Sequence, residues 1–159
     1  MMTATTTDYS GRLVDLLIFQ GVKAEGEAAI TLGLGTAGEI CTGAQKLSQS
    51  FTLLFLTRLG SNPKHPDWGT NFVPAVQQGR VNTEKAVNSE FNTASELVRR
   101  TLAKAWEGTA LPADERLSKA TLNSFTIDTE NSKLVLYVKL VTAAGVSLVI
   151  VLPVPTAIR

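Results

Sequence analysis

Apolar residues recur at alternating spacings of four and three in two separate segments of this chain. The first set is Ile40, Ala44, Leu47, Phe51 and Leu54, and the second is Val87, Phe91, Ala94, Val98, Leu102 and Ala105. These spacings put each set on one face of an α-helix. Thr36 and Glu39 have the spacing of a capping box, so the first helix is predicted to include Ile40 and Cys41. The second is predicted to run from about residue 82 or 83 to Trp106.

In the last third of the chain the apolar period changes to two. Three segments show it or are densely β-branched, at residues 121–127, 133–141 and 146–152. The links between them, residues 128–132 and 142–145, are short enough for hairpins. We therefore predict a three-stranded antiparallel meander, with one face of its middle strand formed by Leu134, Leu136, Val138 and Leu140.

The last of these strands carries almost no polar side chain. Such strands are usually buried on both faces, so we expect both faces of this one to be covered. Pro153 and Pro155 follow, and proline lacks the N–H that a strand ladder needs. The strand is therefore expected to end at Leu152.

The N-terminal part of the chain is predicted to be separate from this core. Residues 1–37 form an extension that could hold a short hairpin, with strands at 15–19 and 29–34 and turn residues at 21–26. Residues 38–159 form a single globular unit. Its predicted fold class is α+β, with two long helices packed on a small antiparallel sheet that ends in the three-stranded meander.

Size and charge restrict the function. The chain has 159 residues and a formal net charge of +1, which suits one domain and gives no basic surplus for a nucleic-acid partner. The longest apolar run, residues 146–154, is about half the length of a membrane helix, and residues 1–9 do not resemble a signal peptide. We therefore expect no membrane contact, and a chain that is made and folded in the cytoplasm.

The residues that usually carry catalysis are scarce. His65 is the only histidine and Cys41 the only cysteine, so neither a zinc-type site nor an internal disulfide is expected. Cys41 is expected to be a small buried side chain. Ser61, His65 and Asp67 crowd one short loop, which does not suit the geometry of a catalytic triad.

Two weaker chemical patterns lead to the same expectation. Three glycines have the bare spacing of a dinucleotide-binding turn, but no second parallel strand follows them: Gly33, Gly35 and Gly38. The carboxylates of the helical half are not marked as a facing pair that could hydrolyse a glycoside: Glu39, Asp67, Glu84, Glu90 and Glu96. We expect no enzyme activity, no catalytic residue, no cofactor and no metal.

A proline-rich loop joins the two predicted helices, and its sequence is Leu56-Thr57-Arg58-Leu59-Gly60-Ser61-Asn62-Pro63-Lys64-His65-Pro66-Asp67-Trp68-Gly69-Thr70-Asn71-Phe72. Prolines keep the residues before them out of the helical region, so a stiff extended loop is expected. The loop resembles the signature of the contractile-tail sheath-initiator family, also grouped as phage tail lysozyme-like. These are baseplate wedge proteins with relatives in type VI secretion baseplates.

The closing element of the loop carries the resemblance. Pro66, Asp67, Trp68 and Gly69 match the family's Pro-acidic-aromatic-Gly element, and the order of elements over residues 38–154 is similar to the family's. Ser61, Asn62 and Lys64 stand where the family often has a Glu and an Arg. A charged contact made by that Glu in relatives therefore cannot be carried over to this chain.

The resemblance implies a structural role in a contractile phage tail. Such proteins dock to the baseplate wedge, and the first sheath ring is thought to polymerise on them by strand exchange. The implied partners are the tail sheath protein and baseplate wedge proteins, with tail tube or hub proteins as further candidates. The implied location is the tail baseplate of the virion, after assembly in the host cytoplasm.

Three surfaces are candidate partner sites. The stiff loop offers Asn62, Pro63, Lys64, His65, Pro66, Asp67, Trp68 and Gly69, with Trp68 either as an anchor for a partner or as a core residue that pins the loop. The edge of the last strand offers Ser147, Leu148, Val149, Ile150, Val151 and Leu152. The second helix offers a basic face at Arg99, Arg100 and Lys104, which could instead be only solvated.

Two alternative functions remain open from the sequence. One is a different tail or head–tail connector with a similar small α+β fold. The other is a tail-associated peptidoglycan hydrolase, which would need a pair of working carboxylates.

Overall fold

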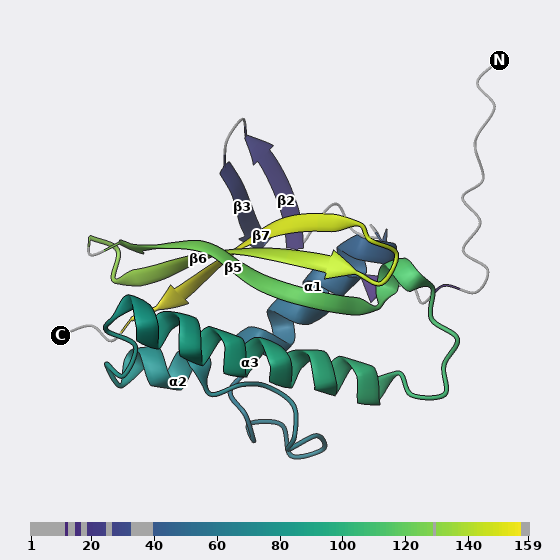
Figure 1. The fold of residues 1–159 in the computed structure, drawn as a ribbon, viewed down its shortest axis with the longest axis horizontal. Helices are drawn as coiled ribbons and strands as arrows, with labels where there is room; N and C mark the ends of the chain where they lie inside the picture. The colour runs from purple at the N-terminus through teal and green to yellow at the C-terminus, as the bar shows by residue number, and fades with distance from the viewer. Residues whose placement is uncertain are drawn as a thin grey trace.

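The computed structural model describes residues 12, 15–16, 19–24, 27–32, 40–128 and 130–156. It shows an α+β protein with three α-helices and a three-stranded antiparallel sheet (Figure 1). The helices are α1 (Gly43–Leu56), α2 (Phe72–Gln77) and α3 (Glu84–Ala105), followed by a short 3-10 helix, η1 (Ala113–Glu115). The main sheet comprises β5 (Leu117–Asp128), β6 (Lys133–Thr142) and β7 (Ser147–Pro155).

The C-terminal meander agrees with the prediction. Its strand order is β5-β6-β7, and both pairs are antiparallel. The predicted inner face of β6 is buried, with Leu134, Leu136, Val138 and Leu140 each at most 2% exposed. In Figure 1, α2 and α3 lie along one side of this sheet, and α1 crosses behind. The sheet therefore buries one face against the helices.

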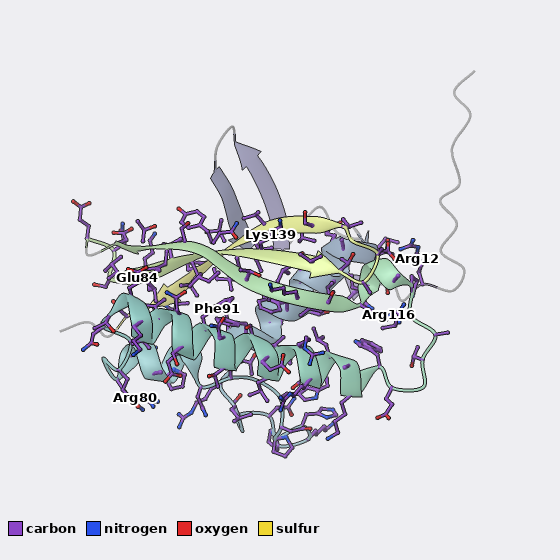
Figure 2. All side chains as sticks on the ribbon, in the orientation of Figure 1. Arg12, Arg80, Glu84, Phe91, Arg116 and Lys139 are labelled. Atoms are coloured by element: carbon purple, nitrogen blue, oxygen red, sulfur yellow. The ribbon has the colours of Figure 1, made fainter. Side chains whose placement is uncertain are left out.

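Four phenylalanines form the centre of the core between helices and sheet. The ring of Phe55 lies 5.6 Å from Phe51, 5.0 Å from Phe72 and 5.5 Å from Phe91, measured between centroids. All four side chains are essentially buried. Figure 2 shows Phe91 between α3 and the sheet. The two predicted apolar helix faces therefore meet in one core.

Helix α3 matches its predicted span, but α1 does not. The Thr83 side chain accepts a hydrogen bond from the Ala86 amide at 3.2 Å and starts α3. Ile40 and Cys41, predicted to be helical, instead form the strand β4 (Ile40–Cys41). The helix begins after this strand because Gly43 has φ +61°, which does not continue a right-handed helix backwards. Cys41 is buried, as expected.

A third helix and longer strands also depart from the prediction. Helix α2 has only six residues and contains Pro74, so no apolar period could reveal it. Strand β5 begins at Leu117 rather than residue 121. The expectation that the last strand ends at Leu152 is wrong, because β7 continues through Pro153 to Pro155. These prolines are tolerated because β7 lies at an edge of the sheet.

The N-terminal strands form two small pairs. β2 (Phe19–Ala24) and β3 (Glu27–Leu32) make a hairpin, with Phe19 opposite Leu32. Its strands occupy positions 21–24 that were predicted to be a turn. β1 (Asp15–Leu16) pairs with β4, so a strand of the predicted extension 1–37 is joined to residues beyond it. The predicted capping box and the three glycines at 33, 35 and 38 lie outside the described residues.

Candidate functional site

The proline-rich loop is closed at its base by backbone hydrogen bonds. The Thr70 amide donates to the Thr57 carbonyl at 2.8 Å, and the Leu59 amide donates to the Thr70 carbonyl at 2.9 Å. The Thr70 hydroxyl also donates to the Phe55 carbonyl, at the end of α1, at 2.7 Å. The loop is therefore tied to the helix that precedes it, rather than merely extended between two helices.

Gly69 makes this closure possible. Its φ is +104°, and a Cβ at this position would lie 2.6 Å from the Thr57 carbonyl oxygen. Such an approach is closer than any real side chain tolerates, so only glycine fits without moving the backbone. Gly60 also has a positive φ, of +78°, but nothing lies within 4 Å of its missing Cβ.

The tip of the loop is built from successive turns. The Asn62 side chain accepts from the Lys64 amide at 3.0 Å, and the Asn62 carbonyl accepts from the His65 amide at 3.2 Å. The Trp68 amide then donates to the His65 carbonyl, and the two rings stack 4.2 Å apart. Pro63, Lys64, His65, Pro66 and Asp67 are exposed, whereas Trp68 is half-buried. The backbone of the tip is thus already held in turns by hydrogen bonds, so binding to a partner would cost little conformational entropy there.

An ion pair fastens this tip to α3. The ammonium of Lys104 lies 3.1 Å from Asp67 Oδ2, with both side chains largely exposed. The hydrogen bond from Lys104 is the main cause that lowers the pKa of Asp67 below its usual value. Asp67 therefore positions the loop, and Lys104 belongs to the same contact.

The other two members of the predicted basic face are also paired within the chain. Arg99 donates two 2.8 Å hydrogen bonds to the carboxylate of Glu96, and Arg100 donates one of 2.9 Å. The bond from Arg99, followed by that from Arg100, lowers the pKa of Glu96 to about 2. The three cations thus pair with two acids of the same chain, which favours the interpretation of a solvated, internally paired helix face over a partner site.

Behind the loop lies a half-open apolar cavity of about 300 Å³. Leu53 and Leu54 of α1 line one side, Leu102 of α3 lines the other, and both tryptophans of the chain, Trp68 and Trp106, contribute to the walls. Trp68 thus contributes to the wall of an apolar groove between the two long helices. The sequence offered Trp68 as an anchor or a core residue, and it gave no sign that Trp106 lies beside the same cavity.

Strand β7 has a ladder partner only on the side of β6, among the strands the structure describes. The Thr156 amide donates to Ser132, and the Val146 carbonyl accepts from Thr142. Because backbone groups of successive strand residues point to alternate sides, even-numbered residues of β7 bond to β6. The backbone groups of Ser147, Val149 and Val151 face away from β6, toward the edge with which no described strand forms a ladder.

The outer face of β7 departs from the expectation that both faces are covered. Ile150, Leu152 and Val154 are buried against the helices. Val149, on the opposite face, is 47% exposed. The hairpin strand β3 approaches β7 without forming a ladder with it, and Figure 1 shows the hairpin rising on the side of the sheet where β7 lies. One apolar face of β7 therefore remains partly open.

Among the described residues, several groups that could take part in catalysis are buried or paired. Across them, no group of three or more His, Cys, Asp or Glu side chains could hold a metal ion. Burial is the main cause that raises the pKa of Cys41, which makes its thiol a poor nucleophile. Two of the five candidate carboxylates, Asp67 and Glu96, are occupied by ion pairs. No helix in the described part of the chain has the length and apolarity needed to cross a membrane.

Sequence reasoning missed a buried carboxylate, Glu115 in η1. Its side chain is 2% exposed, and its Oε1 accepts a hydrogen bond from the Gly43 amide at 3.1 Å. Thr42, the residue before α1, makes no side-chain cap, so Glu115 caps this helix from a distant segment. Lys46 Nζ lies 3.7 Å from Glu115 Oε2 and 4.7 Å from the centre of the Trp106 ring. Nothing in the local sequence marked this glutamate as buried.

Comparisons with protein-family models, with curated proteins and with solved structures found no match to this chain. The functional argument therefore depends on the geometry of the chain itself and on the resemblance of its loop.

Proposed function

We propose that this protein is a structural component of a contractile phage tail baseplate, which docks to wedge proteins and nucleates the sheath by strand exchange with the first sheath ring. The proposal assigns it no catalytic residue and no cofactor. It places the protein in the virion, at the baseplate, with the sheath and wedge proteins as partners and tube or hub proteins as further candidates.

The observation that carries the proposal is the edge of β7 opposite β6, with which no described strand forms a ladder, although β3 approaches β7. Three amides, those of Ser147, Val149 and Val151, point away from β6, and the strand presents carbonyls alongside them. An added strand that pairs with such an edge gains main-chain hydrogen bonds, while side-chain contacts supply specificity. The half-open face around Val149 offers those contacts.

The prolines restrict where a partner strand can pair. Pro153 and Pro155 lie on the same alternation as Val149 and Val151, so their missing amides face the free edge and leave only carbonyls there. The segment that can both donate and accept, residues 147–151, spans about 17 Å at the usual strand rise. A short partner strand is thus favoured over a long one.

The loop supports the second half of the proposal, docking to the wedge. Its base is closed by backbone hydrogen bonds and its tip is tied to α3 by Asp67 and Lys104. A surface that is already ordered loses little conformational entropy on binding. The loop and the β7 edge belong to different elements, so one molecule could hold two partners.

Mixing the full-length chain with purified sheath subunits tests the proposal. We expect the chain to bind sheath and to shorten the lag before sheath polymerises, because it supplies a preformed strand edge. Light scattering follows polymerisation, and pull-down measures binding. A chain that neither binds sheath subunits nor changes the lag would overturn the proposal.

A further inference from the structure

We propose that the β2–β3 hairpin guards the edge of β7 opposite β6, and that a partner strand must displace the hairpin before it can add to that edge. The inference rests on the proposed function, because it names the step that regulates strand addition at the same site. The guard is a segment of this chain, so the hairpin and the partner strand compete for one place.

Strand β3 lies beside the edge of β7 rather than over a face of the sheet. Cα atoms of β3 come within 8 Å of β7, whereas β3 makes no comparable approach to β6. A strand stacked on the outer face would lie about 10 Å away and would cover β6 as well. Figure 1 agrees with the position at the edge, since the hairpin rises on the side of the sheet where β7 lies.

At this distance β3 leaves too little room for a partner strand. Neighbouring strands of a sheet lie about 4.8 Å apart, so a strand inserted between β7 and β3 needs a gap of about 10 Å. The gap is narrower than this where β3 lies within 8 Å of β7. Strand addition along β7 therefore requires that β3 moves away first.

The hairpin is held loosely enough to be displaced. Among the described strands, β2 and β3 pair only with each other, and β3 forms no ladder with β7. An isolated two-stranded hairpin is only marginally stable in water. A partner strand that forms a ladder with β7 gains main-chain hydrogen bonds that β3 does not make there, so it can displace the hairpin.

A guard at this place also has a physical purpose before assembly. An unpaired strand edge is a template on which a second molecule can add in the wrong place, and proteins often cover such edges with another segment. The prolines protect only the far end of β7, at Pro153 and Pro155. The hairpin supplies cover that the sequence of β7 itself does not supply at residues 147–151.

Replacement of residues 19–32 by a glycine-serine linker of equal length tests the proposal in the otherwise complete chain. The flanking strands β1 and β4 pair with each other, and the linker preserves their connection. Amide hydrogen exchange is then compared with that of the unchanged chain. We expect exchange at Ser147, Val149 and Val151 to rise by up to about tenfold, as for a guard that is open about a tenth of the time.

The same strand provides the matched control. The amides of Leu148 and Ile150 face β6, so their exchange should stay unchanged in the linker variant. Unchanged exchange at these two positions also shows that the main sheet is still folded.

A second variant opens the guard without removing the segment. Ala29→Pro combined with Ile30→Pro breaks the hairpin, because neighbouring amides point to opposite sides and one of the two prolines must remove an amide of the β2 ladder. It should raise exchange at the same three amides of β7 as the linker does.

Both variants are then mixed with purified sheath subunits. We expect their affinity for sheath to rise by about tenfold and the lag before polymerisation to shorten, because apparent affinity scales with the fraction of molecules that are competent to bind. Weaker sheath binding by the linker variant would overturn the proposal, since it would make the hairpin part of the partner site. Equal exchange at Ser147, Val149 and Val151 in all three chains would overturn it as well.

Failure of the guard is distinct from failure of the proposed function, because the exchange measurement contains no sheath. Faster exchange in variants that do not bind sheath supports the guard and contradicts the sheath role. Nucleation of sheath by the unchanged chain, with equal exchange in the variants, supports the sheath role and contradicts the guard.

Discussion

Glu115 and Lys46 form a buried ion pair that also caps a helix. Both side chains are at most 8% exposed, and Glu115 Oε2 has no hydrogen-bond partner among the described residues. A buried charge without its partner costs far more than an exposed one, because the interior solvates it poorly. The pair therefore makes the start of α1 dependent on a residue more than seventy positions away.

We predict that Glu115→Ala lowers the free energy of unfolding by about 3–5 kcal/mol, since it leaves Lys46 buried without its acid and removes the acceptor for the Gly43 amide. Urea unfolding followed by circular dichroism measures this. Asp114→Ala is the matched control, because Asp114 is the adjacent acid but is 27% exposed and pairs with Arg12. Asp114→Ala should lower the free energy of unfolding distinctly less than Glu115→Ala. Equal losses of stability in the two variants would contradict the role given to Glu115.

Single residues are also where the sequence was least informative. The spacing rules located Phe51, Phe91 and Val98 in the core, because burial on a helix follows a period. No such rule applies to Glu115, whose partners are Gly43 and Lys46 of α1 and Arg12, or to Trp106, whose groove is made with the loop. These roles depend on contacts between distant segments, which a local pattern does not contain.

At the scale of elements, the position of the proline-rich loop depends more on the hydrogen bonds between its two ends than on its prolines. Its tip makes turns of its own, but the Thr57 and Thr70 contacts fix where that tip lies. Gly69 permits those contacts, because its Cα passes close to the carbonyl of Thr57. The orientation of Trp68, the next residue toward the tip, therefore depends on this glycine.

A pair of glycine variants tests this dependence. Gly60→Ala should lower the free energy of unfolding by about 1–2 kcal/mol, the cost of a left-handed backbone for an ordinary residue. No steric cost is added, because nothing lies within 4 Å of the new Cβ. Gly69→Ala should cost clearly more, since its Cβ would also strike the Thr57 carbonyl. Thermal unfolding gives the difference, and amide exchange at Leu59 should rise only in Gly69→Ala. Equal effects from both substitutions would show that the close approach is unimportant.

Elements with strong local signals were predicted well. Helix α3 has a Thr83 cap, a long apolar stripe and a glycine beyond its end, so its bounds could be read directly. The start of α1 could not be read, because Ile40 fits both a helix stripe and the β4 strand that pairs with β1. In β7 the prolines led to a wrong prediction of where the strand ends, because a proline interrupts a strand only where a neighbouring strand needs its amide.

At the scale of the whole molecule, the fold class and the meander followed from the sequence, but the arrangement of its free surfaces did not. The α+β class follows from a change of period from helical to alternating along one chain. Which strand lies at an edge, and which of its amides point outward, depends on register. Only the paired structure gives that register.

Two proline substitutions in β7 separate strand addition from folding. Val149→Pro removes an amide that faces the free edge, so it should leave the sheet intact and slow sheath nucleation. Ile150→Pro removes an amide on the side of β6 and should destabilise the sheet itself, because central ladder bonds are lost. Unfolding midpoints and nucleation lag are measured for both. Normal nucleation by a folded Val149→Pro variant would argue against strand exchange at this edge.

The two edges of the main sheet are not equivalent. Strand β5 carries two irregularities in its register, near Leu117 and near Leu122, whereas β7 pairs with β6 without interruption. Bulges twist an edge away from further pairing. A sheet with a single regular edge can be extended on one side only. If sheath subunits are added there, each copy of this protein starts one row of subunits and gives that row a direction.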